Sequence, residues 1–180
     1  MKTYFTSDTH WGHKNILRFC ESTRPFASVD EMDTALINNW NARVQPEDTV
    51  YILGDVFFHK AVRALEIARA LNGHKHLIVG NHDGVITATQ ELVAEFESVQ
   101  PYLKVKIDGV DVIMFHYPIM EWDRMHYGSY HLFGHVHGKF THPGRAMDVG
   151  IDTRPNADAS PWSWEEVQAY CSQRPILSHH

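Results

Sequence analysis

The stretch at residues 49–55, TVYILGD, decides the fold, because an apolar run ends there in a glycine and an aspartate. Its β-branched and aromatic residues predict a buried strand over 49–53. The same pattern recurs further on, where a predicted strand at 76–79 runs into Gly80-Asn81-His82-Asp83. Parallel sheets present their functional loops at the carboxyl ends of the strands. We therefore expect the polar residues that follow these two strands to meet at one edge of a sheet.

Predicted helices alternate with the strands in the first half of the chain. Residues 2–7 form the first predicted strand. The sequence SVDE at 28–31 is a capping box, and it opens a helix whose apolar residues recur at helical spacing. A second helix is predicted over 61–71, closed by Asn72-Gly73. This alternation indicates an α/β fold.

The second half of the chain is predicted to be antiparallel. Predicted strands at 103–107 and 110–115 flank Asp108-Gly109, which is a strong hairpin signal. A further strand is expected over 130–133, and the last helix begins at a second capping box, 163–166.

The length of 180 residues suits one domain with a substantial core. We predict a single domain over 1–177, with 178–180 as a tail or a tag remnant. The chain opens without a secretory signal, and no apolar run approaches the roughly 20 residues of a membrane helix. Cys20 and Cys171 form no disulfide framework. These features predict a cytoplasmic protein with no membrane partner.

The net charge of −6 supplies no basic stripe, which argues against tight binding to long nucleic acid. An acidic chain can still hold a phosphate, because bound divalent cations invert the local charge.

Five short polar clusters stand in order, each at the end of an apolar run. They are Asp8-Thr9-His10, Gly54-Asp55, Gly80-Asn81-His82-Asp83, His116 and Gly134-His135-Val136-His137. Two adjacent cations need a carboxylate between them, and Asp55 is the natural candidate because it is central in this order. Oxygen and imidazole ligands without sulfur suit manganese, iron, zinc, cobalt or nickel better than calcium or copper(I). Such a pair of ions activates water against a phosphoryl group, so phosphoester hydrolysis is the leading hypothesis.

This ordered set resembles the calcineurin-like metallophosphoesterase superfamily. The flanking residues 8–16 and 24–26 resemble a small, uncapped bacterial and phage branch of it. The resemblance implies a four-layer α/β/β/α sandwich with two mixed β-sheets and a dinuclear centre at their loop edges. It also implies the ligands of two divalent ions, with manganese expected first. The first ion would be held by Asp8, His10, Asp55 and His137, and the second by Asp55, Asn81, His116 and His135.

The resemblance further implies a mechanism, in which a hydroxide that bridges the two metals attacks phosphorus in line. His82, outside both ligand sets, would contact the phosphoryl oxygen or protonate the leaving group, and Asp83 would orient the His82 ring. In the same branch, a stretch similar to residues 148–152 closes the sheet beside the site, which implies that Asp148 and Asp152 either have a structural role or support the ligands from outside the ligand sets. The candidate substrate contacts are His13, Arg24, His59 and Tyr117.

Differences between this sequence and other branches of the superfamily narrow the range of expected substrates. Protein serine/threonine phosphatases continue after the bridging aspartate with Asp-Arg-Gly, whereas Asp55 is followed here by Val56 and Phe57. Purple acid phosphatases place a tyrosine ligand where Phe58 stands. Without the arginines that bind a dianionic monoester, small phosphodiesters such as cyclic nucleotides or aryl diesters are the favoured substrates, and phosphomonoesters are secondary ones. The alternatives are a nuclease of the superfamily and a non-catalytic metal-binding scaffold.

Overall fold

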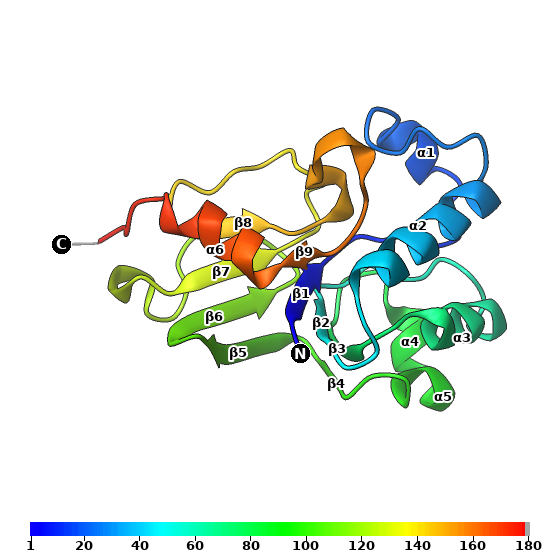
Figure 1. The fold of residues 1–180 in the computed structure, drawn as a ribbon, viewed down its shortest axis with the longest axis horizontal. Coiled ribbons are helices and arrows are strands. Elements are labelled where there is room, and N and C mark those ends of the chain that lie inside the picture. The colour runs from blue at the N-terminus through cyan, green and yellow to red at the C-terminus, as the bar shows by residue number, and fades with distance from the viewer. Residues whose placement is uncertain (179–180) are drawn as a thin grey trace.

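The computed structural model describes residues 1–178, and the histidines at 179 and 180, interpreted above as part of a tail or tag remnant, lie outside the described residues. Two mixed β-sheets pack face to face, and helices cover the outer side of one of them (Figure 1). The predicted fold of two mixed sheets is confirmed. No helix of the described chain is long and apolar enough to cross a membrane.

The first sheet has the strand order β4-β3-β2-β1-β9. Its strands are β1 (Thr3–Thr6), β2 (Thr49–Ile52), β3 (His74–Ile78), β4 (Ser98–Gln100) and β9 (Trp162–Ser163). The first four run parallel, and β9 pairs antiparallel with β1. The bounds of β1 and β2 lie within one residue of their predicted positions, whereas β3 begins two residues earlier and ends one residue earlier than predicted.

The second sheet has the order β5-β6-β7-β8. Its strands are β5 (Tyr102–Ile107), β6 (Val110–Phe115), β7 (Tyr130–Phe133) and β8 (Ala146–Asp148). The hairpin β5–β6 is confirmed as antiparallel, with both Asp108 and Gly109 at positive φ as its tight turn requires. The prediction of an antiparallel second half is wrong beyond this hairpin, because β6 pairs parallel with β7, and β7 with β8. The long segments between these strands let the chain cross over and return in the same direction.

Helices form the layer outside the first sheet. The helices before β5 are α1 (Ile16–Phe19), α2 (Val29–Arg43), α3 (Ala61–Ala70), α4 (Gly84–Thr87) and α5 (Gln90–Val93). The predicted start of α2 is confirmed, since the Ser28 side chain accepts a hydrogen bond from the backbone N–H of Glu31. Short 3-10 turns lie at η1 (Met125–Tyr127), η2 (Ile151–Thr153) and η3 (Pro155–Ala157).

The last helix, α6 (Trp164–Ser172), closes the side of the sandwich beside β9 and β8. Its predicted capping box is confirmed, with reciprocal hydrogen bonds between Ser163 and Glu166. The Trp164 ring contacts both Phe5 of the first sheet and Tyr130 of the second. The helix therefore fastens the two sheets together.

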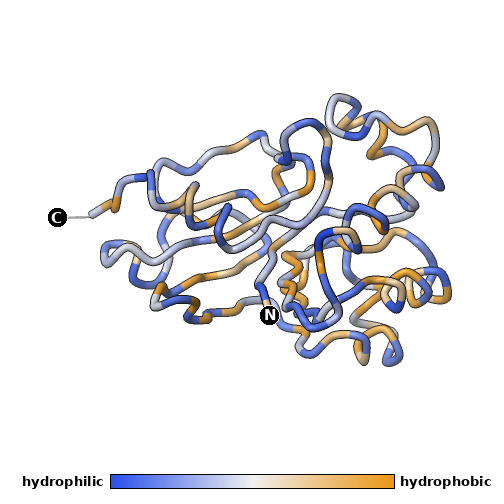
Figure 2. The backbone as a smooth tube through the Cα atoms, in the orientation of Figure 1, coloured by the Kyte–Doolittle hydropathy of each residue, from blue (hydrophilic) through white to orange (hydrophobic). Residues whose placement is uncertain are grey.

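Apolar side chains form three clusters, which follow the layers. One lies between the helices and the first sheet, one between the two sheets, and one outside the second sheet. The outermost cluster contains Trp122 and Met125, so η1 and the loops beside it supply the layer there. Figure 2 shows apolar stretches along the strands of both sheets, whereas many of the connecting loops are hydrophilic.

Candidate metal centre

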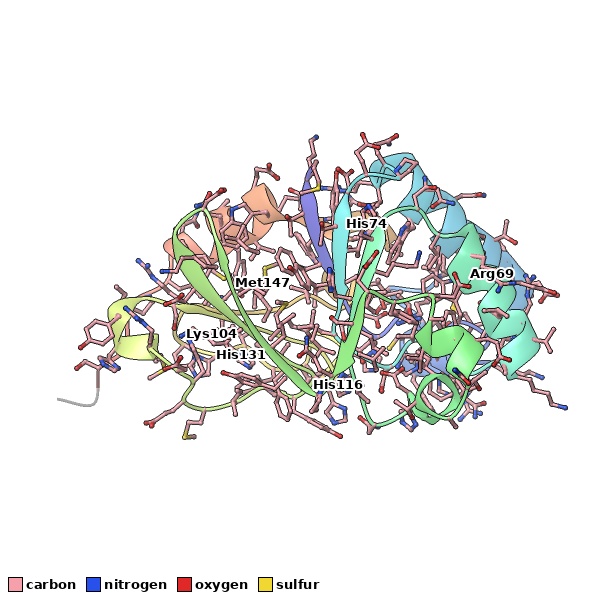
Figure 3. All side chains as sticks on the ribbon, turned by 90° about the horizontal axis from the view of Figure 1, so that it is seen from below. Arg69, His74, Lys104, His116, His131 and Met147 are labelled. Carbon is pink, nitrogen blue, oxygen red and sulfur yellow. The ribbon has the colours of Figure 1, made fainter. Side chains whose placement is uncertain are left out.

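The five polar clusters meet at the edge where the carboxyl ends of strands from both sheets come together. In Figure 3, His116, which follows β6, lies toward the opposite end of the strands from His74, which begins β3. Within the first sheet, the backbone N–H of Asp8 donates to the Gly54 carbonyl at 3.0 Å. Between the sheets, the backbone N–H of His135 donates to Oδ2 of Asp8 at 2.8 Å. The predicted meeting of these loops is thus confirmed.

Three side chains form a first ligand group, consisting of Asp8, His10 and His137. Oδ1 of Asp8 lies 3.8 Å from Nε2 of His10 and 3.8 Å from Nε2 of His137. Asp8 Oδ1 and His10 Nε2 are buried and have no hydrogen-bond partner in the described chain. Buried polar atoms are almost always satisfied, so two unpaired ligand atoms this close together fit a site that can hold a metal ion.

A second ligand group consists of Asp55, His116 and His135, whose ligand atoms all lie within 4.8 Å of one another. Asn81 belongs beside them, because its Oδ1 is 3.1 Å from Nε2 of His116. Asn81 and His135 are exposed, whereas Asp55 and His116 are buried. The second group therefore faces solvent on one side.

The Asp55 carboxylate lies between the two groups. One oxygen, Oδ2, is 3.7 Å from Nε2 of His10, and the other, Oδ1, is 3.6 Å from Nε2 of His116. One carboxylate is thus within reach of ligand atoms in both groups. The donor set of carboxylate, amide and imidazole suits divalent cations of the first transition row.

Each of three imidazoles is fixed through its Nδ1 atom, which leaves Nε2 toward the centre. Nδ1 of His10 lies 2.9 Å from Nδ1 of His13. Nδ1 of His116 lies 2.6 Å from the Leu53 carbonyl oxygen, and Nδ1 of His137 lies 2.7 Å from Oδ2 of Asp152. Such outer partners set the tautomer and ring orientation of a ligand histidine. Asp152 therefore contacts His137 directly, from a position outside the two ligand groups.

The backbone at the centre is strained. Left-handed φ angles occur at Asp8, His10, Asp55, His135 and His137. Non-glycine residues rarely adopt this conformation, and it persists where the surroundings enforce it, as at functional sites. Glycine is required nearby, because a Cβ at Gly80 would lie 2.5 Å from Oδ1 of Asp55.

The electrostatics of the first group favour a cation. Burial lowers the pKa of His137, but the hydrogen bonds to Asp152 and Cys20 and the charges of Asp8 and Asp152 together outweigh this and raise the pKa to about 10. A proton on His137 Nε2 therefore balances the surrounding carboxylates when no ion is bound. A divalent ion would have to displace that proton, so its binding releases protons.

His82 is exposed and stands beside both groups. Its backbone N–H donates to Oδ1 of Asp55 at 2.9 Å, and its ring lies 5.0 Å from that of Phe58 and 6.4 Å from that of His10. The ring is therefore close to the ligand groups, on an open side of the centre.

Asp83 does not orient His82, which corrects the expectation from sequence. Its buried carboxylate accepts three backbone N–H groups, from Gly80 at 2.7 Å, Val56 at 2.8 Å and Asp55 at 3.0 Å. Burial raises the pKa of this carboxyl. Asp83 thus ties the loop after β3 to the loop after β2, because three converging amides leave it little capacity for an imidazole.

One of the candidate substrate contacts is exposed at the centre, and the others contact neighbouring residues of the chain. Tyr117 is exposed at the centre, and its hydroxyl donates to Oδ1 of Asn81 at 3.2 Å. Nδ1 of His13 lies 2.9 Å from Nδ1 of His10, and the His13 ring stacks on Phe58 with ring centroids 4.0 Å apart. His59 is occupied by Asp33, whose Oδ2 lies 2.5 Å from its Nε2.

Arg24 is not placed to bind a substrate anion, which corrects a second expectation. It is 1% exposed and is engaged by Asp152 and by the backbone carbonyls of Asp8 and Thr9. Sequence reasoning also missed Asp33, which is buried on α2 and accepts the backbone N–H of Gly12 at 3.0 Å. Asp33 lies three residues before the apolar Leu36 on the predicted helix, and this spacing is the sequence signal that places Asp33 on the buried face.

The chain is similar in sequence to proteins of two mycobacteriophages and of an archaeon. The gene 66 protein of Mycobacterium phage L5 is 30% identical over 83% of this chain and 86% of its own length. The gene 66 protein of Mycobacterium phage D29 is also 30% identical, over 83% of this chain and 87% of its own. An uncharacterised protein of Methanocaldococcus jannaschii, MJ1445, is 48% identical, but the match spans only 46% of this chain and 47% of that protein. No protein-family model matches the chain.

Among solved structures, a protein of unknown function from Aquifex aeolicus has a TM-score of 0.72 and 26% identity, and covers 94% of this chain and 98% of its own. An archaeal phosphodiesterase is more distant, with a TM-score of 0.47 and 20% identity over 83% of this chain and 84% of its own. The chain belongs to the family of the mycobacteriophage gene 66 proteins, and its ordered motifs resemble those of the calcineurin-like metallophosphoesterase superfamily.

Proposed function

We propose that this protein is a dinuclear metal-dependent phosphodiesterase that hydrolyses small phosphodiesters, such as cyclic nucleotides or aryl diesters, with phosphomonoesters as secondary substrates. One observation carries the proposal. The Asp55 carboxylate turns one oxygen to each ligand group, 3.7 Å from His10 Nε2 and 3.6 Å from His116 Nε2. A structural or single-ion site would not need a carboxylate shared in this way.

The proposed ligands divide between two ions, with Asp55 common to both. Asp8, His10 and His137 complete the first set, and Asn81, His116 and His135 complete the second. When bound, two divalent ions supply Lewis acidity toward the phosphoryl group and lower the pKa of water. Manganese is the first ion to test, because the donors are oxygen and imidazole without sulfur.

His82 is the proposed proton donor to the leaving alkoxide or contact to the phosphoryl oxygen. The geometry supports this role because the ring is exposed at the centre and its backbone is fixed by Asp55. A group that gives up a proton to a leaving oxygen must reach it directly, and a surface-facing imidazole can do so. Its orientation depends on the loop that Asp83 holds, not on a bond from Asp83 to the ring.

The preference for diesters rests on charge and shape. A phosphomonoester dianion is commonly bound by arginine, but the guanidinium of Arg24 is already used by Asp152 and two carbonyls. Aromatic rings stand on two sides of the centre, with Phe58 packed against His10 at 4.7 Å and Tyr117 against His135 at 4.6 Å. Rings on both sides suit the organic groups that a diester carries on both sides of phosphorus.

A substrate panel tests the proposal. The protein is stripped of metal, refilled with manganese and assayed against an aryl phosphodiester, cyclic nucleotides, an aryl phosphomonoester and plasmid DNA. We expect metal-dependent turnover that is fastest on the small diesters. Faster cleavage of plasmid DNA would favour the nuclease alternative. Absence of turnover on every substrate, with both ions bound, would favour the scaffold alternative.

A further inference from the structure

Arg24 and Asp152 form a buried pair behind the first ligand group. Nε of Arg24 donates to Oδ1 of Asp152 at 2.9 Å, and Nη2 donates to Oδ2 at 2.7 Å. The two side chains are each 1% exposed. This two-bond arrangement fixes both planes, which a single-point contact would not do.

Hydrogen bonds from this pair support the segments that carry all three residues of the first ligand group. The same guanidinium donates to the carbonyl of Asp8 and, at 2.9 Å, to that of Thr9, so it holds the turn that carries Asp8 and His10. Through Asp152 it also holds His137, whose Nδ1 lies 2.7 Å from Oδ2. Segments more than a hundred residues apart in sequence are thus aligned by one side chain.

We propose that Arg24 and Asp152 are positioning residues that set the metal affinity of the first ligand group without setting that of the second. The inference rests on the proposed function, since it assigns an ion to each group. Its selectivity follows from the separate support of the second group, in which His116 is held by the Leu53 carbonyl at 2.6 Å. Removing the outer partner of a ligand histidine typically weakens metal binding about 10- to 100-fold.

A competing use of the same residues is a third cation site. Cys20, His137 and Asp152 also have ligand atoms within 4.8 Å of one another. The guanidinium of Arg24, however, already occupies both oxygens of Asp152 and places a positive charge there. A further cation would meet that charge directly, so the geometry points to a support for His137 and not to a third ion.

Calorimetric titration of metal-stripped protein with manganese tests this inference. The variants are Asp152→Asn, which keeps the side-chain shape, and Arg24→Lys, which keeps the charge but loses the two-bond geometry. Arg154→Lys is the matched control, because Arg154 is also buried and paired with carboxylates, those of Asp158 and Glu166. Circular dichroism of each metal-free variant checks that it folds.

Wild type and Arg154→Lys should bind two equivalents. Asp152→Asn should bind one equivalent normally and the other about 10- to 100-fold more weakly, and Arg24→Lys should change in the same direction. The inference would be overturned if a folded variant bound both manganese equivalents equally more weakly, or bound both as tightly as the wild type does. A wild type that binds fewer than two equivalents would instead contradict the proposed function, and the inference with it.

Discussion

The backbone N–H of His82 donates to Oδ1 of Asp55 at 2.9 Å, so the proposed proton donor is fastened to the carboxylate between the two ligand groups. The contact uses the main chain, which leaves the His82 ring free to meet a substrate. Substituting the ring should therefore disturb catalysis and leave the ligand groups in place.

His82→Ala should lower kcat for an aryl diester by about 10²- to 10⁴-fold, the usual contribution of a positioned acid. Its manganese content, measured by atomic absorption, should remain that of the wild type. A variant that keeps wild-type kcat would remove His82 from the proposed mechanism. Loss of metal together with kcat would make it a structural residue instead.

Asp83→Asn should act on stability. In the variant, an NH2 group takes the place of one carboxylate oxygen. This donor then faces buried backbone N–H groups that need an acceptor, and such a mismatch lowers the free energy of unfolding by about 2–4 kcal/mol. In a chain of this size we expect a fall in Tm of roughly 5–15 °C, measured by calorimetry on the metal-free protein. The pH profile of kcat should keep its shape, and a shifted profile with an unchanged Tm would support a direct role for Asp83 in proton transfer.

The candidate centre follows from sequence to the extent that it depends on chain order and strand ends. Asp8, Asp55 and His116 each follow a strand with an apolar pattern, and the arrangement of parallel strands brings such positions to one edge. The helix starts at Ser28 and Ser163 also follow, because a capping box is a local device.

What could not be predicted depends on contacts between distant segments. Arg24 lies beside a proline in an irregular stretch, and only the folded chain shows that it meets Asp152. Asp83 follows His82 directly, which suggested a pair, but the backbone turns its carboxylate toward the amides of the neighbouring loop. The parallel course of β7 was missed because the hairpin signal at Asp108 says nothing about the longer crossover that comes after β6.

Tyr117→Ala tests substrate stacking. If the ring packs against a nucleobase, its loss should raise KM for a cyclic nucleotide about 5- to 150-fold, since stacking on an aromatic side chain contributes about 1–3 kcal/mol. Tyr117→Phe keeps the ring and should keep KM within a few-fold. Tyr127→Ala is the control, because Tyr127 is 72% exposed on η1. An equal effect of the Ala and Phe variants would mean that the hydroxyl bond to Asn81, not the ring, matters.

His131 should make the fold sensitive to acid. Burial lowers its pKa from 6.5 to about 4, and its two ring nitrogens are bonded to the Ile113 carbonyl and the Ile119 N–H. Between pH 6.5 and pH 4 the unfolded chain binds this proton and the folded chain does not, so stability falls as the pH drops. The loss from this group approaches about 3 kcal/mol at the acid end.

Urea unfolding of wild type and His131→Gln at pH 7, 5.5 and 4.5 measures that contribution. The variant should be less stable at pH 7 and should lose less stability on acidification. Parallel pH dependences in the two proteins would show that His131 titrates normally.

Turnover of an aryl phosphodiester by wild type and Asp55→Asn, each with its bound manganese counted, tests the dinuclear mechanism most directly. Asp55→Asn keeps the shape of the side chain but removes the charge between the ligand groups. We expect the wild type to hold two manganese ions and to turn over, and Asp55→Asn to hold fewer ions and to lose at least about 10²-fold in kcat. Wild-type turnover in Asp55→Asn would contradict a reaction that depends on two ions sharing this carboxylate.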